Sequence, residues 1–239
     1  MVPQPPPEWG NDELSKFLQQ THANQYATFV RKRGWYNRLS IIDSHFYRVA
    51  TNVINPRNPV AVTLFYRSHS AFRAACGNAM AGQAVETMVV VRSCLENAAY
   101  SLHIHENPGH DLLWLNRNQT EAETKAMKAA FLNGRLRETI GKKDKRLLSV
   151  FDELYERAID FGGHPNQRGI SGSAKMVHEQ DHIQFLQIYL HNDDISLDHA
   201  LKTTAQTGIC ALRLAQFTMK EKFELLGVRE GIDRAQQGL

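Results

Sequence analysis

The stretch that decides the fold is Ala84–Glu106, with the sequence AVETMVVVRSCLENAAYSLHIHE. Its apolar residues fall on most sides of a helix, and a helix of this kind is usually buried. Arg92, Glu96 and His103 interrupt it at intervals of four and seven residues, so the three side chains share one side of the helix. Because a buried charge must be paired and hydrogen-bonded, this polar stripe predicts either a structural ion-pair network or the wall of a site.

Helical periodicity extends outward from this stretch in both directions. Apolar residues recur at intervals of three and four, and glycine, asparagine and proline punctuate the pattern. A tight connection at residues 77–83 makes the preceding helix antiparallel to the stretch, which brings Arg67 and Arg73 near the polar stripe. We expect helices before the stretch at about 12–33, 35–54 and 59–76, and after it at about 120–132, 142–161 and 197–226.

One segment departs from the helical pattern. Around residues 174–191, β-branched and aromatic residues cluster with partial alternation. The predicted fold class is therefore mostly all-α, a single domain like a helical bundle with a small β-hairpin insertion near residues 174–191. We divide the chain into a flexible proline-rich arm at residues 1–10, a helical domain at 11–226 and a polar tail at 227–239.

Composition indicates an ordinary folded protein. Of the 239 residues, 42% are hydrophobic and 22% charged, and the net charge of +3 is too mild to indicate a nucleic-acid binder by itself. The three cysteines are widely spaced and lie among apolar residues, which favours free thiols in a reducing compartment. The amino terminus lacks the pattern of a secretory signal, and charges interrupt the longest apolar run. We expect a cytoplasmic protein with no membrane partner.

Residues 178–182, HEQDH, match the HExxH pattern of zinc metalloproteases. That chemistry needs His178 and His182 on one face of a helix, with the intervening glutamate as general base. Asp181 carries a charge where those enzymes have an uncharged residue, and the neighbouring sequence is strand-like. A solvated polar turn is the favoured interpretation and a zinc hydrolase only the third hypothesis for function, so we expect no metal and no cofactor.

A second catalytic hypothesis rests on Arg157 and His164, which six residues separate. HEPN-type ribonucleases use such a spacing, with the arginine stabilising charge at the scissile phosphate and the histidine acting as acid or base. Arg157 can instead pair with Glu153 one turn earlier. The basic run at residues 142–146 leaves nucleic acid open as a partner, although Asp144 interrupts it and no aromatic residues interleave with it.

Residues 84–96, AVETMVVVRSCLE, followed at a distance by Tyr155 and by His164-Pro165-Asn166, resemble a family of bacterial helical proteins of unknown function. In that family a helix with arginine, leucine and glutamate recurs before a later His-Pro or His-Gly turn, and the family is distantly similar to the HEPN superfamily. The resemblance covers about residues 60–225. It implies an all-helical core with a small β-hairpin insertion and directs attention to the matching arginine, glutamate and histidine, but it implies no established reaction.

The leading functional hypothesis is a protein that acts through binding or assembly, with a homo-oligomer or another protein as partner. Charged groups within an apolar helix must be satisfied, and the loop after residue 163 supplies further donors and acceptors. Whether the protein is an enzyme stays open. The predicted binding residues lie on the polar stripe and on this loop: Arg92, Glu96, His164, Asn166 and Arg168.

Overall fold

The computed structural model describes residues 4–163, 167–178 and 181–239. Within these ranges the chain forms twelve α-helices, one π-helical turn and a two-stranded antiparallel hairpin, which confirms the predicted fold class. The elements are α1 (Glu13–Arg31), α2 (Arg33–Ala50), α3 (Pro59–Ala81), α4 (Ala84–Glu106), α5 (His110–Leu115), α6 (Glu121–Ala130), α7 (Asn133–Lys143), α8 (Lys145–Ala158), η1 (Ile159–Gly163), α9 (Gln167–Ser173), β1 (Ala174–His178), β2 (Ile183–Gln187), α10 (Ile195–Thr218), α11 (Lys220–Leu225) and α12 (Val228–Gln236).

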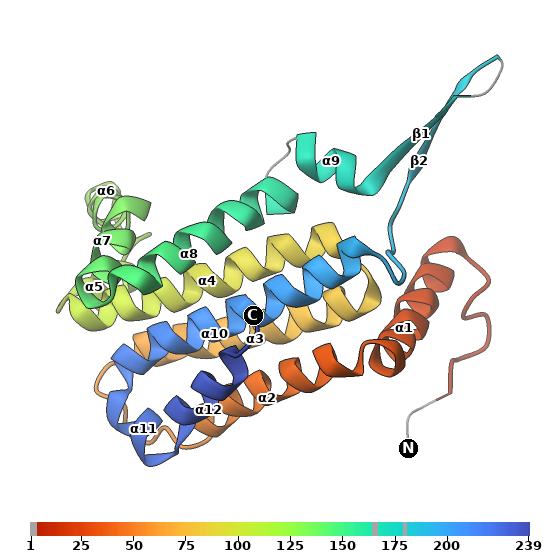
Figure 1. Ribbon diagram of the computed structural model, residues 1–239. Helices are drawn as coiled ribbons and strands as arrows, with labels where there is room; N and C mark the ends of the chain where they lie inside the picture. The colour runs from red at the N-terminus through yellow and green to blue at the C-terminus, as the bar shows by residue number, and fades with distance from the viewer. Residues whose placement is uncertain (1–3, 164–166, 179–180) are drawn as a thin grey trace.

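Three long helices, α3, α4 and α10, run side by side through the centre of the molecule (Figure 1). Helix α4 is buried along most of its length, as its sequence predicts, and Val91, Leu95 and Leu102 have no exposed surface. The turn between α3 and α4 requires a glycine: Gly82 has φ +83°, and a Cβ atom there would lie 2.0 Å from the carbonyl oxygen of His191. This close approach fixes the start of α10 against the α3–α4 turn.

Helix α1 forms where the sequence predicts it, but it buries its polar side. Leu14, Tyr26 and Val30 are exposed, whereas Asn24 and Thr28 are buried. The Asn24 side chain donates a hydrogen bond to the carbonyl oxygen of Ala81, so α1 contributes to satisfying the carboxyl end of α3 rather than the apolar core. The apolar periodicity of residues 14–30 therefore marks a solvent-facing stripe.

The expected polar tail at residues 227–239 is wrong, because this segment contains α12. Val228, Ile232 and Ala235 are buried against the core, and Gly231 packs on the ring of His45 from α2. The apolar stripe has only three members within nine residues, too few to stand out against the charged residues around it. Helix α12 closes the side of the bundle next to α2 (Figure 1).

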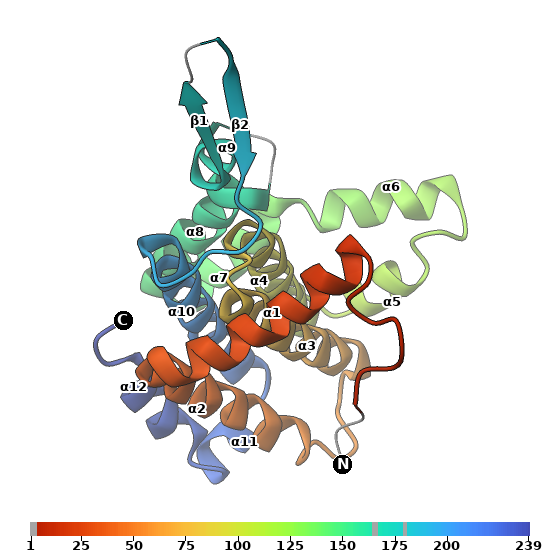
Figure 2. The same ribbon diagram turned by 90° about the vertical axis from the view of Figure 1, so that its right-hand side faces the viewer.

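The β1–β2 hairpin projects from one end of the helical body (Figures 1 and 2). Its strands pair from Ala174 opposite Gln187 to His178 opposite Ile183. At the base, η1 lies against the start of α4: a Cβ atom on Gly162 would lie 2.4 Å from the carbonyl oxygen of Val85. No described helix has the length and apolar character needed to cross a membrane.

Candidate functional site

The polar stripe of α4 meets α8 in a compact ionic cluster. Arg92 Nε donates to Glu96 Oε1 over 2.9 Å, and the Tyr155 hydroxyl donates to the same oxygen over 2.9 Å. Both charged side chains are partly exposed, 28% for Arg92 and 39% for Glu96. The charges of the stripe are therefore paired, as an apolar helix requires, but they lie at the edge of the core rather than inside it.

Tyr155 connects this cluster to α7. The guanidinium carbon of Arg92 lies 5.3 Å from the centre of the Tyr155 ring, and that of Arg137 lies 5.1 Å from it. Arg137 also donates to Asp152 over 2.6 Å. Burial raises the pKa of Tyr155, and its hydrogen bond to Glu96 raises this pKa further, so the phenol stays protonated at neutral pH. The cluster joins three helices and presents no activated nucleophile.

The expected approach of Arg67 and Arg73 to this stripe is wrong. Arg73 forms a two-pronged ion pair with Asp43 of α2, with distances of 2.7 and 2.9 Å, and His69 Nε2 lies 2.7 Å from the same carboxylate. Arg67 is exposed on α3. The sequence places both arginines on α3 correctly, but periodicity alone did not reveal that their side of α3 faces α2 and solvent.

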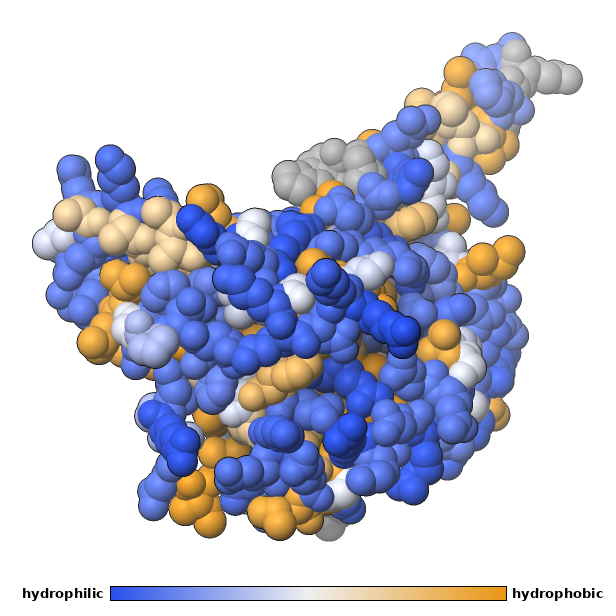
Figure 3. All heavy atoms as spheres, turned by 60° about the vertical axis from the view of Figure 1, so that its left-hand side comes forward, coloured by the Kyte–Doolittle hydropathy of each residue, from blue (hydrophilic) through white to orange (hydrophobic). Residues whose placement is uncertain are grey.

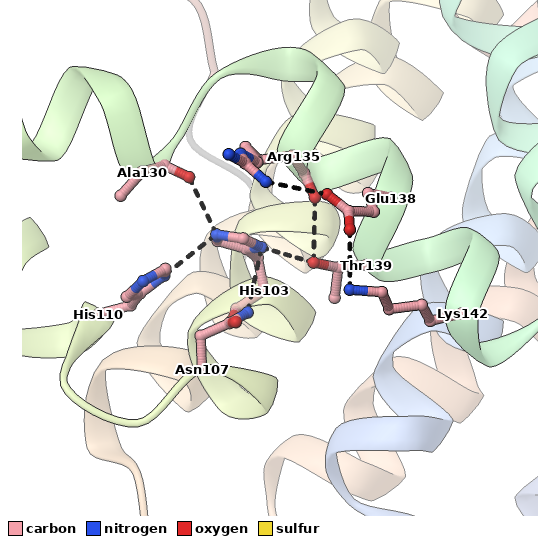
Figure 4. A network of polar contacts seen from close by, with 8 residues as sticks. All are labelled: His103, Asn107, His110, Ala130, Arg135, Glu138, Thr139 and Lys142. Carbon is pink, nitrogen blue, oxygen red and sulfur yellow. Dashed lines mark hydrogen bonds and ion pairs between the residues drawn. The ribbon is translucent and has the colours of Figure 1, made fainter.

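His103, the third member of the stripe, is buried in a separate polar network at the far end of α4 (Figure 4). Its Nδ1 lies 2.7 Å from the Thr139 hydroxyl, and its Nε2 lies 3.1 Å from the Ala130 carbonyl oxygen and 3.1 Å from His110 Nδ1. Burial lowers the pKa of His103, and the neighbouring His110 lowers it further. The Ala130 carbonyl oxygen can only accept, so a neutral ring with its proton on Nε2 donates to it and leaves Nδ1 to accept from the Asn107 amide, 3.3 Å away.

In the described part of the chain, no group of three or more histidine, cysteine, aspartate or glutamate side chains is placed to hold a metal ion. His178 ends β1 and His182 directly precedes β2, so the two do not share a helix face, as the strand-like sequence predicts. The glutamate between them, Glu179, lies outside the described residues. The helical geometry on which the zinc-hydrolase hypothesis depends is therefore missing.

The Arg157 side chain of α8 points toward α10. It pairs with Glu153, the structural alternative that the sequence offers to a catalytic role. It also donates to the Gln206 side-chain oxygen over 2.6 Å. Its side chain is 19% exposed. His164 and Asn166 lie outside the described residues, and Arg168 pairs with Asp160, which ties α9 to η1 at the base of the hairpin.

The hairpin carries a feature that sequence reasoning missed. Apart from the half-buried Ala174, every residue of its two strands is exposed. Cross-strand partners share a face of a hairpin, so one face carries Met176, Phe185 and Ile183, and the other carries Val177 and Leu186. In Figure 3, orange and pale-orange atoms lie among blue ones on the segment that stands away from the body. The available signal was incomplete alternation, which predicts apolar groups on both faces.

Compared with protein-family models, with curated proteins and with solved structures, the chain matches none. The fold and the side-chain geometry alone thus define its class: a helical protein with a half-buried ionic cluster and an exposed apolar hairpin.

Proposed function

We propose that this protein acts by assembly, and that two copies of the chain join through the β1–β2 hairpin. The observation that carries the proposal is the exposure of five apolar side chains on a two-stranded hairpin that projects from the helical body. Phe185 is 73% exposed, Met176 62% and Ile183 51%. Contiguous apolar surface of this kind commonly marks an interaction site.

The hairpin itself gains stability when its apolar face is buried. A two-stranded hairpin is marginally stable in water by itself, and both of its outer edges present unpaired N–H and C=O groups. Burying the face of Met176, Ile183 and Phe185 against a partner supplies the missing hydrophobic stabilisation. Association at this hairpin therefore stabilises the element that performs it.

A second copy of the chain suits this surface best. The Met176–Phe185 face holds no acidic or basic strand residue other than His178, so it needs no oppositely charged partner. Two identical apolar faces can meet about a two-fold axis, the commonest symmetry of protein dimers. The ion pair between Arg168 and Asp160 and the hydrogen bond from Ile188 N to Ser173 O hold the hairpin base, so the face is presented in a defined direction.

Arg92 and Glu96 of the ionic cluster lie on α4, and Val85 at the start of the same helix contacts Gly162 of η1. The partly exposed charges of this cluster suit the polar rim of an interface, where such groups are common. We assign it a supporting role there, and we assign another to Arg168 through its ion pair with Asp160 at the hairpin base.

The cysteines support a reducing compartment, and we propose the cytoplasm. Cys76, Cys94 and Cys210 form no disulfide among the described residues. Burial raises the pKa of Cys94 to about 12, which makes it an inert thiol.

Sedimentation velocity on the full chain tests the proposal with a matched pair of variants. Phe185→Glu puts a charge on the hairpin face, and Tyr26→Glu puts one on α1 at a side chain of nearly equal exposure, 72%. We expect a dimer for the natural chain and for Tyr26→Glu, and a monomer with an unchanged circular dichroism spectrum for Phe185→Glu. A monomeric natural chain, or dissociation by Tyr26→Glu alone, would overturn the proposal.

A further inference from the structure

A groove of about 640 Å³ is lined by residues of α8, α10 and α12 and of the turns beside them. Its apolar lining includes Leu147, Val150 and Leu154 of α8 and Ile209 of α10. The size falls within the range of small-molecule sites, about 300–1,000 Å³. Neither the ionic cluster nor the hairpin contributes to this groove, so it is independent of the proposed assembly surface.

Three carboxylates line the groove, and each already has partners. Asp144 accepts hydrogen bonds from the backbone N–H groups of Arg146 and Leu147 at 2.8 and 3.0 Å, where it caps α8. Glu153 pairs with Arg157, and Asp233 pairs with Arg213. The two ion pairs offset the charges of Glu153 and Asp233, whereas the backbone hydrogen bonds leave Asp144 charged.

Two arginines of the groove remain uncommitted. Arg146 and Arg229 are exposed, and within the described ranges neither forms an ion pair. With Arg213 paired to Asp233 and Arg157 to Glu153, the only side-chain carboxylate of the described lining without an arginine partner is Asp144, while Arg146 and Arg229 are both unpaired. A guanidinium group binds a carboxylate or phosphate through two parallel N–H···O bonds, so the two unpaired arginines favour an anionic head.

We propose that this groove binds an amphiphile with one anionic headgroup. Arg146 and Arg229 hold the carboxylate or phosphate monoester at the rim, and the alkyl body lies along Leu147, Leu154 and Ile209. The anionic group of the ligand thus matches the two arginines, and its alkyl chain matches the apolar side chains. A small polar anion lacks the alkyl chain, and a neutral alcohol lacks the anionic group.

Isothermal titration calorimetry with four short amphiphiles tests the match. Octyl phosphate and octanoate carry the anionic head, 1-octanol is neutral, and octylammonium is cationic. We expect at least one anion to bind roughly tenfold more tightly than the alcohol and the cation. The tighter of the two anions identifies the headgroup. Equal affinity for octylammonium and the anions would overturn the proposal.

Variants locate the binding within the molecule. In the double variant Arg146→Gln, Arg229→Gln, we expect the affinity for the anion to fall roughly tenfold or more. Arg67→Gln is the matched control, because Arg67 is exposed on α3 and does not line the groove, and it should leave the affinity unchanged. An unchanged affinity in the double variant contradicts the proposal.

Val150 supplies a second test that does not depend on removing arginine. It is 42% exposed in the groove, so both Val150→Glu and Val150→Lys should fold. The glutamate should weaken anion binding and the lysine should maintain or strengthen it. The same change in affinity from both substitutions would mean that shape rather than charge governs the site, against the proposal.

Discussion

The Tyr155 hydroxyl donates a hydrogen bond to Glu96 Oε1 over 2.9 Å, and this contact joins α8 to α4. The Arg92 guanidinium of α4 and that of Arg137 from α7 both lie over the same aromatic ring. One side chain thus connects three helices at the edge of the core. The polar stripe of α4 stabilises the packing of these helices, beside any role it has at an interface.

Tyr155→Phe removes the hydroxyl and leaves the ring. We expect a loss of about 1–2 kcal/mol in the free energy of unfolding, because the carboxylate of Glu96 loses a donor that α8 supplied. Urea denaturation measures the loss. Glu96→Gln is the control: it keeps an acceptor for Tyr155, although a neutral and weaker one, and loses the ion pair along α4, worth about 0.2–0.5 kcal/mol. A smaller loss for Tyr155→Phe than for Glu96→Gln would show that the hydrogen bond contributes little.

Asp43 should make stability depend on acid pH. Although burial opposes the effect, hydrogen bonds from His69 and Arg73 hold the pKa of Asp43 below its ordinary value of 3.8. A depressed pKa in the folded state contributes stability that is complete above the unfolded pKa and is lost as the pH falls below it. The difference in unfolding free energy between the natural chain and Asp43→Asn should therefore shrink below about pH 4. If the difference in unfolding free energy between the two chains stays constant from pH 6 to pH 2, the pKa of Asp43 is not lowered in the folded state.

His103 should titrate below the ordinary histidine pKa of 6.5, because burial and the neighbouring His110 both disfavour its charged form. Folding then favours the neutral ring, so its contribution to stability is complete above pH 6.5 and decreases as the pH falls through that value. Proton NMR of the imidazole resonances follows the titration, with a His103→Gln sample to assign the signal. A pKa of 6.5 or higher for that resonance would refute the buried neutral network of Figure 4.

Two glycine substitutions test the docking of α12. A Cβ atom on Gly231 would lie 2.2 Å from His45 Cε1, so Gly231→Ala forces α12 away from α2 and should cost about 1–3 kcal/mol. Gly134→Ala in α7 meets no atom within 4 Å and should be neutral or stabilising by about 1 kcal/mol or less. Thermal unfolding compares the two. Equal melting temperatures would mean that α12 does not pack on His45.

The central helices followed from the sequence because their apolar residues alone specify burial. Residues 84–106 have apolar groups on nearly every side, and α4 forms over the same range with its interior buried. Asn24 of α1 shows the limit of this reasoning, since the helix buries a polar face to bond the end of α3. Periodicity locates a helix, but the partners available to its polar groups decide which face turns inward.

The candidate site was predicted less completely than the fold. The pairing of Arg92 with Glu96 follows from their spacing of four residues. Tyr155 and Arg137 come from other helices, and nothing in a local pattern reports which distant residues pack together. The exposure of Phe185 was equally hidden, because a strand-like segment predicts a hairpin without predicting what covers it.

Photo-cross-linking from position 185 tests whether two copies of the chain meet at the β1–β2 hairpin. A photoreactive phenylalanine in place of Phe185 keeps the aromatic ring and reports the nearest chain. We expect an adduct of twice the 27.2 kDa chain mass, with the cross-link mapped to residues 174–187 of the second copy. The same probe in place of Tyr26 should give no such adduct. Cross-links from position 185 that stay within one chain, or that reach α1 of the second copy, would contradict assembly through the hairpin.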